Sequence, residues 1–302
     1  MTWEARPAAG HRDVLAGIAV RHEAYARKLP LLAVQGQRLA SRREHRAVPW
    51  VLDRGDGTIV STLLCHPIEL ALDGRVFPAY GLGSVGTRIA ERRQGHAAAL
   101  CAAACAASEA AGRPVGLLFS DIAPAYYERL RFVSSPAWEG RCERLADLAA
   151  SGDAASDVRL EPVDPRREAE RLTALWGRAH RGTLHPHRDT AGFLENVEDA
   201  GGSDWFFLVR GRAEGYLRLW APPDGTLEVG ESAFTDPDDE AGALRAAARL
   251  AIDAGKTALE GWMAPTPFVR AWFAPTPRTE ALPMLRGAPP HETARFWPPN
   301  HF

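Results

Sequence analysis

The chain has 302 residues, which is enough for two domains that each bury a core of their own. Charged residues make up 25% and hydrophobic residues 46%, as in globular proteins, and the formal net charge is −2. No overall field recruits a nucleic acid or an anionic membrane, so neither is an expected partner. No apolar run approaches the ~20 residues that span a bilayer, and the first residues lack the apolar core of a signal peptide. We therefore expect a cytoplasmic protein.

The first half of the chain predicts an α/β layer. A strand is expected at residues 2–8, a helix from 11 to a stop at Pro30, and a second helix over 31–44. Strands joined by tight turns at residues 55–57 and 73–74 should fill residues 48–82. A further strand is expected over 83–90, then an alanine-rich helix to about Gly112, a buried strand and a short helix ending near residue 132. This order predicts helices packed on a mixed sheet.

The same layout starts again after residues 145–157, which are small and polar and are interpreted as a linker. A strand and helix over 157–180, strands over 205–234, and an alanine-rich helix ending at Gly255 follow in order. An apolar strand and an aromatic helix after Pro267 complete the repeat. We interpret this as an internal duplication, with domains at 1–145 and 156–302. Each is expected to hold a mixed, mostly antiparallel sheet flanked by helices.

The first alanine-rich helix begins without an ordinary cap. Its entry reads Arg92-Arg93-Gln94-Gly95-His96-Ala97 and has no Ser, Thr, Asp or Asn to bind the free N–H groups. A helix start with a glycine and neighbouring arginines is suited to bind a phosphate. The alternative is a helix start that water caps, with both arginines merely exposed. The second copy instead has Asp236, Asp238, Asp239 and Glu240, which complement the positive helix end with the chain's own carboxylates.

Two short motifs in this half resemble those of the Gcn5-related N-acetyltransferases (GNAT). Arg92-x-x-Gly95-x-Ala97 is similar to their acyl-CoA signature, Gln/Arg-x-x-Gly-x-Gly/Ala. Further on, Ser120-Asp121-Ile122-Ala123 and then Tyr127-x-x-x-Arg131-Phe132 resemble their Asn-x-x-Ala and Tyr-x-x-x-Gly-Phe motifs. The resemblance covers roughly residues 1–135, with motifs from 85 to 132. It implies two tandem GNAT-like domains, of which the second is a degenerate copy.

The resemblance also implies a donor site for acetyl-CoA, used as a co-substrate without a metal. Residues implied to bind acetyl-CoA are Thr87, Arg88 and Ile89 beside the pantetheine arm, Arg92, Arg93, Gln94, Gly95, His96 and Ala97 around the diphosphate, and Ser120. In such enzymes an amine attacks the thioester directly, and a tyrosine often protonates the leaving thiolate. That role maps onto Tyr127. Tyr126 is its rival, and one of the two should face away because adjacent helical positions diverge.

The chain departs from the family pattern at two positions. Ser120 stands where asparagine is usual, which is a mild change. Arg131 stands where glycine is usual, at a helix end that often needs a positive φ. This departure bears on local geometry more than on activity.

The residue that removes the acceptor's proton is left open between several groups. Asp121, Tyr80, Glu91 and His96 are the nearby candidates, and each is as well explained as a solvated side chain. The chain end is a further candidate. Tandem aminoglycoside acetyltransferases of the enhanced intracellular survival type, which this chain resembles distantly, use a C-terminal phenylalanine carboxylate, so Phe302 is a candidate catalytic residue. Ordinary hydrophobic docking of the tail is the alternative.

Other polar patterns favour structural roles. His185 and His187 lack the Cys or carboxylate partners of a zinc site and are interpreted as a lead-in to a helix. Cys101 and Cys105 share one helix face and are expected to be buried rather than to form a redox pair. Several tryptophans of the second half are expected in its core, and some of them as walls of an acceptor pocket between the halves.

Together these features predict an acetyl-CoA-dependent N-acetyltransferase acting on a primary amine of a small molecule or peptide, such as an antibiotic. The second half would complete the acceptor cleft. Two alternatives stay open: a non-catalytic acyl-CoA sensor, and a tandem aminoacyl transferase that uses aminoacyl-tRNA. The near-neutral charge and the intact acyl-CoA motif count against the second. The acceptor and the oligomeric state are not specified by the sequence.

Overall fold

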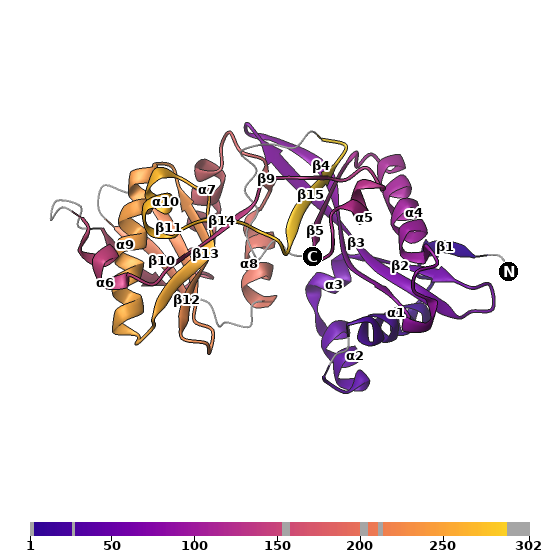
Figure 1. The fold of residues 1–302 in the computed structure, drawn as a ribbon. Helices are drawn as coiled ribbons and strands as arrows, with labels where there is room; N and C mark the ends of the chain where they lie inside the picture. The colour runs from indigo at the N-terminus through magenta and orange to yellow at the C-terminus, as the bar shows by residue number, and fades with distance from the viewer. Residues whose placement is uncertain (1–2, 26–27, 153–157, 200–204, 211–213, 289–302) are drawn as a thin grey trace.

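The chain folds into two lobes, each built on one β-sheet with helices on its faces (Figure 1). The structure is a computed structural model, and it describes residues 3–25, 28–152, 158–199, 205–210 and 214–288. No helix within these ranges is both long enough and apolar enough to traverse a lipid bilayer.

The elements of the first half follow the predicted order closely. They are β1 (Glu4–Pro7), α1 (His11–Ala24), α2 (Leu31–Ala40), α3 (Arg42–Arg46), β2 (Val48–Asp53), β3 (Ile59–Leu72), β4 (Arg75–Thr87), the single-turn helix η1 (Ile89–Glu91), α4 (His96–Ala110), β5 (Val115–Ser120), α5 (Ala125–Glu128) and β6 (Val133–Ser134). The strand predicted over 83–90 is wrong as a separate element, because β4 runs without a break to Thr87 and the chain then enters η1.

The elements of the second half repeat this order. They are β7 (Trp138–Cys142), α6 (Leu145–Ala150), β8 (Arg159–Val163), α7 (Ala169–Ala179), β9 (His185–Pro186), α8 (Thr190–Asp199), β10 (Trp205–Arg210), β11 (Gly215–Trp220), β12 (Thr226–Phe234), α9 (Pro237–Asp253), β13 (Ala258–Trp262), α10 (Pro267–Trp272), β14 (Thr276–Pro277) and β15 (Leu282–Arg286). The predicted lead-in at His185 is a short strand, β9, which pairs with β3 of the first lobe.

The two sheets have matching topologies. The first has the order β1-β2-β3-β4-β5-β15-β6, and the second has β8-β10-β11-β12-β13-β7-β14. In the first, only β4 and β5 are parallel neighbours, and in the second only β12 and β13 are. Both are therefore mixed, mostly antiparallel sheets flanked by helices, as the sequence predicts.

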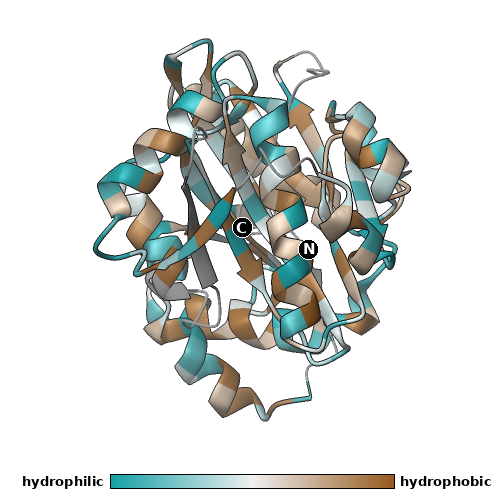
Figure 2. Ribbon diagram, turned by 90° about the vertical axis from the view of Figure 1, so that its left-hand side faces the viewer, coloured by the Kyte–Doolittle hydropathy of each residue, from teal (hydrophilic) through white to brown (hydrophobic). Residues whose placement is uncertain are grey.

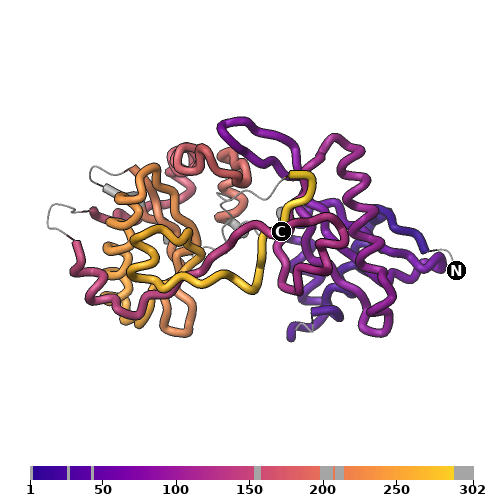
Figure 3. The backbone as a smooth tube through the Cα atoms, turned by 45° about the horizontal axis from the view of Figure 1, so that its top comes forward, coloured from indigo at the N-terminus to yellow at the C-terminus, as the bar shows by residue number. Residues whose placement is uncertain are grey.

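The halves exchange one strand in each direction. β15, near the end of the described chain, lies between β5 and β6 in the first sheet, whereas β7 pairs with β13 and β14 in the second. Figures 1 and 3 show the yellow C-terminal segment leaving the second lobe to reach the first. The predicted split at residues 1–145 and 156–302 therefore does not coincide with the sheets. Pairing between distant strands is not encoded in the local pattern of either segment.

The predicted linker at residues 145–157 is wrong over its first part. Residues 145–150 form α6, whose Leu145 and Leu148 are buried in the core of the second lobe, and residues 153–157 lie outside the described ranges. Two leucines at this spacing lie on one helix face, so the segment packs although its composition is small and polar.

The first lobe's core lies between its sheet and the alanine-rich helix α4. Leu100, Cys101, Ala104 and Cys105 of α4 are each 0% exposed and pack against the sheet. Small alanine and cysteine side chains let the helix approach the sheet closely, and all four cysteines of the chain are free and buried, as expected. Along the helices teal and brown segments alternate in Figure 2, as amphipathic helices require.

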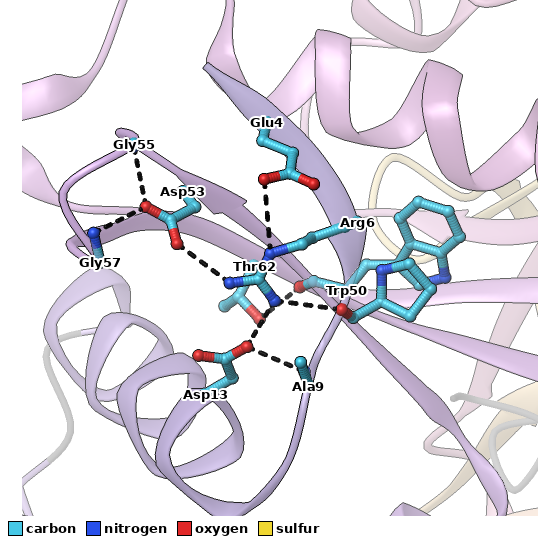
Figure 4. Close-up of polar contacts among 10 residues, drawn as sticks. Glu4, Arg6, Ala9, Asp13, Trp50, Asp53, Gly55, Gly57 and Thr62 are labelled. Carbon is cyan, nitrogen blue, oxygen red and sulfur yellow. Dashed lines mark hydrogen bonds and ion pairs between the residues drawn. The ribbon is translucent and has the colours of Figure 1, made fainter. Parts of the chain in front are cut away.

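A polar cluster around Arg6 joins β1, α1 and the β2–β3 turn (Figure 4). The Arg6 guanidinium donates to Asp13 Oδ2 at 2.5 Å and to Asp53 Oδ2 at 3.0 Å. Asp53 Oδ1 in turn accepts the N–H groups of Gly55 and Gly57, at 2.8 and 3.1 Å. The hydrogen bond from Arg6 is the main cause that holds the pKa of Asp13 below its ordinary value.

We expect Arg6→Leu to lower the free energy of unfolding at pH 7 by about 2 kcal/mol, because it removes charge-assisted hydrogen bonds to two carboxylates. A depressed carboxyl pKa stabilises the fold above the unfolded-state pKa, and that contribution is lost as the pH falls. The difference between wild type and variant should therefore shrink below about pH 4 in urea titrations. Arg12→Leu, which removes a neighbouring positive charge on α1, is the control. Equal effects of the two variants, or a difference unchanged at low pH, contradict this role.

Candidate active site

A cavity of about 540 Å³ opens where β4 and β5 diverge. The parallel register between the strands runs from Ala79–Val115 to Leu82–Leu118. Beyond that point β4 continues beside β3 alone, while Phe119 and Ser120 of β5 pair with β15. Residues 83–87 of β4 line the opening, so their backbone borders the cavity instead of a neighbouring strand.

A bulge in β4 shapes this wall of the cavity. The register with β3 shifts between Thr62 and Leu64, and Ser84 has a φ of 53°. Tyr25 is the residue that follows α1. Its hydroxyl donates to the Val85 carbonyl at 2.7 Å, and it lines the same cavity. A bulge bends a strand away from its neighbour, so this irregularity supports the divergence of β4 from β5.

The N-terminus of α4 forms one end of the cavity. Gly95 is its N-cap, with a φ of 81°, and no side-chain hydrogen bond caps the helix within the described chain. A Cβ atom added at Gly95 would meet nothing within 4 Å, so the space before the helix is open. The first N–H groups of this 15-residue helix thus face a cavity with the positive end of the helix dipole.

In the matching helix of the second lobe, α9, the chain's own carboxylates compensate the positive end of the helix dipole. Asp236 is its N-cap and accepts the N–H of Asp238 at 2.9 Å, and Pro237 occupies the first helical position. Asp238, Asp239 and Glu240 all lie in the first turn. This confirms the contrast predicted from the sequence, in which only the first copy leaves its helix start without a carboxylate.

Two arginines and a histidine surround the start of α4. Arg92 donates to the Ala24 carbonyl at 2.9 Å, and Arg93 has a φ of 65°, and both line the cavity. His96 also lines it, is 8% exposed, and stacks against Trp3 with ring centroids 4.3 Å apart. Its buried Nε2 has no hydrogen-bond partner within the described chain. This arrangement presents positive and donor groups to an anion.

The structure brings together most of the residues predicted to bind acetyl-CoA. Those that line the cavity are Thr87, Arg92, Arg93, Gly95, His96 and Ala97. Arg88 and Ile89 do not line it, because both bond Glu23 of α1: the Arg88 guanidinium at 3.0 Å and the Ile89 N–H at 2.7 Å. The splayed segment therefore consists of residues 83–87, and the prediction of Thr87 to Ile89 was placed too late in the chain.

Two further predicted residues lie beside the cavity without lining it. The Gln94 side chain donates to Glu91 Oε2 at 3.3 Å. Ser120 is 1% exposed and donates its hydroxyl to the Ile122 carbonyl at 2.8 Å, so it supports the turn after β5.

Tyr126 and Tyr127 both line the cavity, and their rings meet edge to face with centroids 4.9 Å apart. The prediction that one of them faces away was wrong, because α5 is a single turn at the rim of the cavity and both rings fit along it. Tyr127 is 8% exposed and packs in the core with Phe132, whereas Tyr126 is half-buried. Burial raises the pKa of Tyr126 to about 12 and that of Tyr127 further, so both hydroxyls are protonated at neutral pH.

The end of α5 confirms the expectation that the position of Arg131 needs a positive φ. It has a φ of 63°, and the Phe132 N–H donates to the Tyr127 carbonyl at 3.1 Å. This is the left-handed helix stop that glycine usually occupies. Arg131 is exposed and is absent from the described cavity lining, so the strained position serves the turn.

The candidates for the group that removes the amine's proton lie in different surroundings. Tyr80 is 0% exposed and sits in the core, where its hydroxyl lies 3.5 Å from Glu109 Oε1. Glu91 lines the cavity at the α4 end and is bonded to Arg54. Asp121 lines the cavity, as both tyrosines do, and is exposed. Phe302 lies outside the described residues.

The second half contributes to the cavity through the exchanged strand. Ala281, just before β15, lines it, and its N–H donates to Asp121 Oδ1 at 3.0 Å. Phe119, another lining residue, lies 6.4 Å from the ring of Trp262 on β13. No tryptophan is among the described lining residues of the cavity, so the expectation that tryptophans wall an acceptor pocket stays a prediction. Sequence reasoning missed Tyr25, Ser84 and Ala281, and only the Gly83-Ser84 pair, typical of a bulge, offered a signal.

Within the described ranges, no group of three or more His, Cys, Asp and Glu side chains is arranged to hold a metal ion. His185 is instead buried, and its Nδ1 lies 2.9 Å from the Thr183 carbonyl oxygen.

Comparison with known proteins agrees with this geometry. Residues 13–132 match the family model described as an acetyltransferase (GNAT) domain. This segment of the chain is therefore similar to a GNAT acetyltransferase domain. Its matched residues include the divergent strands, the start of α4 and Tyr127, which are the parts that build the cavity. This domain type is that of acyl-CoA-dependent N-acetyltransferases. No curated protein matches the chain in sequence.

Solved GNAT structures share the fold over both lobes. A GCN5-related N-acetyltransferase from Kribbella flavida is 18% identical, with 94% of this chain and 71% of that chain covered and a TM-score of 0.72. A probable N-acyltransferase from Enterococcus faecalis is 14% identical, with 95% and 72% covered and a TM-score of 0.75. Eis1 from Mycobacterium abscessus is 16% identical, with 94% and 73% covered and a TM-score of 0.63. At these identities the likeness establishes a common fold.

The predicted binding of CoA at the start of α4 can be tested with a matched pair of glycines, one at each end of this helix. Gly95 and Gly112 have φ values of 81° and 79°, and each has open space around an added Cβ. We expect Gly95→Asp to weaken CoA binding at least about 100-fold, since its carboxylate would cap the helix and repel a diphosphate. Gly112→Asp carries the same backbone strain at the far end of the helix and should bind CoA as wild type does. Calorimetry with CoA measures both, and equal affinities for the two variants exclude the assignment.

Proposed function

We propose that the protein is an acetyl-CoA-dependent N-acetyltransferase that acetylates a primary amine in a ternary complex. The observation that carries this proposal is the open N-terminus of α4 in a cavity that Tyr127 also lines. A diphosphate at the helix start and a thioester near the tyrosine would span that cavity.

The donor would be held by the first N–H groups of α4, by Arg92 and Arg93, and by backbone groups of residues 83–87. Gly95 supports this fit because its open surroundings allow a phosphate to approach the backbone. Acetyl-CoA supplies the acetyl thioester. The protein's contribution is to fix its position relative to the acceptor, which lowers the entropic part of the barrier.

In the chemical step, the acceptor amine would attack the thioester directly. The acceptor ammonium would first lose a proton to solvent. The neutral nitrogen would then form a bond to the thioester carbonyl carbon while the carbon–sulfur bond breaks, and the surplus proton on that nitrogen would pass to solvent. Tyr127 would donate its hydroxyl proton to the departing sulfur and regain a proton from solvent. Its hydroxyl is protonated at neutral pH, as an acid must be before it donates.

The second lobe would be a degenerate copy of the GNAT domain. Its matching strand order and direction support this, and the carboxylate cap of α9 would prevent it from binding the same donor. It would act by supplying β15 and the segment before it to the acceptor end.

Tyr127→Phe and Tyr126→Phe form a matched pair for this proposal. We expect Tyr127→Phe to lower the rate of acetyl transfer about 100-fold in single-turnover assays across a panel of amines, because a positioned acid is lost. Tyr126→Phe should stay within about threefold of wild type, and both should bind CoA normally.

An unchanged rate in Tyr127→Phe contradicts its role as the acid. CoA binding without turnover of any amine by the wild type contradicts the enzymatic proposal and favours an acyl-CoA sensor.

A further inference from the structure

We infer that the acceptor is a monoamine with an apolar or aromatic body and that Asp121 binds its ammonium group. This inference rests on the proposed function and deepens it, because it names the class of acceptor. It follows from the charges and the surface of the cavity around Asp121.

Asp121 lines the same cavity as Tyr127. It directly follows β5 and lines the cavity with Phe119, Ile122 and Tyr126. An amine bound to Asp121 would therefore lie in the cavity that holds the group proposed to protonate the leaving thiolate.

One oxygen of the Asp121 carboxylate is held by a hydrogen bond, and the other is available to a ligand. Oδ1 accepts the N–H of Ala281 at 3.0 Å, and Oδ2 has no hydrogen-bond partner among the residues that the structure describes. The side chain is exposed to the cavity. A carboxylate with one fixed and one unused oxygen can accept a hydrogen bond from an ammonium group at a defined position.

Arg278 holds the segment that orients Asp121, and it leaves the negative charge of Asp121 available to a ligand. Its guanidinium lies over the Trp262 ring at 3.2 Å from the centroid and donates to the carbonyls of Glu280 and Ala281. Of the two acidic groups that act on Arg278, Glu139 has the larger effect and Asp121 the smaller. The second lobe thus fixes Ala281, and Ala281 fixes the carboxylate.

The charges of the cavity are arranged for a single cation. Among its described lining residues the carboxylates are Glu91 and Asp121. Glu91 is bonded to Arg54 and Gln94 and lies beside the arginines at the α4 end. Among the described lining residues, Asp121 is the carboxylate left to bind a cation, whereas an acceptor with several ammonium groups would need several carboxylates to offset its loss of water.

The surface beside Asp121 is apolar. Phe119, Ile122 and Tyr126 flank the carboxylate, and Ile122 is 51% exposed. An exposed large apolar side chain beside a single charge suits a ligand that pairs an ammonium with a hydrophobic body, since burial of both surfaces favours binding.

Calorimetry with phenethylamine and the neutral phenethyl alcohol, in the presence of CoA, tests this site. We expect the amine to bind wild type at least about tenfold more tightly than the alcohol, as one charge-assisted hydrogen bond provides. Asp121→Asn keeps an acceptor for the Ala281 N–H and should remove that preference. Glu128→Gln removes a nearby exposed charge outside the described lining and should keep it.

Kanamycin, which carries several ammonium groups, should bind more weakly than phenethylamine. Tighter binding of kanamycin, equal binding of amine and alcohol, or a preference that survives in Asp121→Asn overturns the inference. The thermal midpoint and the CoA affinity of Asp121→Asn should match wild type, which separates a lost contact from a misfolded variant. An amine that binds through Asp121 and is never acetylated leaves the site standing and refutes the proposed function.

Discussion

The rest of the site depends on one electrostatic constraint, the uncompensated positive end of α4. A glycine N-cap leaves its first N–H groups without a side-chain partner within the described chain, and they face a cavity instead of the protein core. Unpaired backbone donors are costly when buried, so such a helix start persists only where solvent or a ligand can reach it. The divergence of β4 from β5 supplies that access.

Reciprocal strand exchange makes the two lobes interdependent. Strand β15 completes the first sheet, and β7 completes the second, so neither sheet is whole without a segment from the other half of the chain. The crossing segments also bond each other, with the Arg278 N–H donating to the Ala137 carbonyl at 3.0 Å. Ala281, just before β15, lines the cavity at this crossing. Segments of both halves therefore share one cavity, and the second half is more than an appended module.

Local chemistry was readable from the sequence, and long-range pairing was not. The uncapped start of α4, the aspartate cap of α9 and the left-handed Arg131 each follow from a few neighbouring residues, and the structure confirms all three. The exchange of β7 and β15 depends on contacts between segments about 120 and about 165 residues apart, which no local pattern specifies. The same reason explains why Ala281 was missed, because only the exchange brings it to Asp121. Arg88 and Ile89 were misplaced because η1 ends the strand early.

We expect the start of α4, and not that of α9, to receive the diphosphate of CoA. Titration of the isotopically labelled protein with CoA, followed through its backbone amide resonances, tests this directly. Large shifts are expected for Gly95, His96 and Ala97, and none for Asp238 and Asp239. Shifts confined to the start of α9, or saturable CoA binding that leaves the α4 amides unmoved, would contradict it.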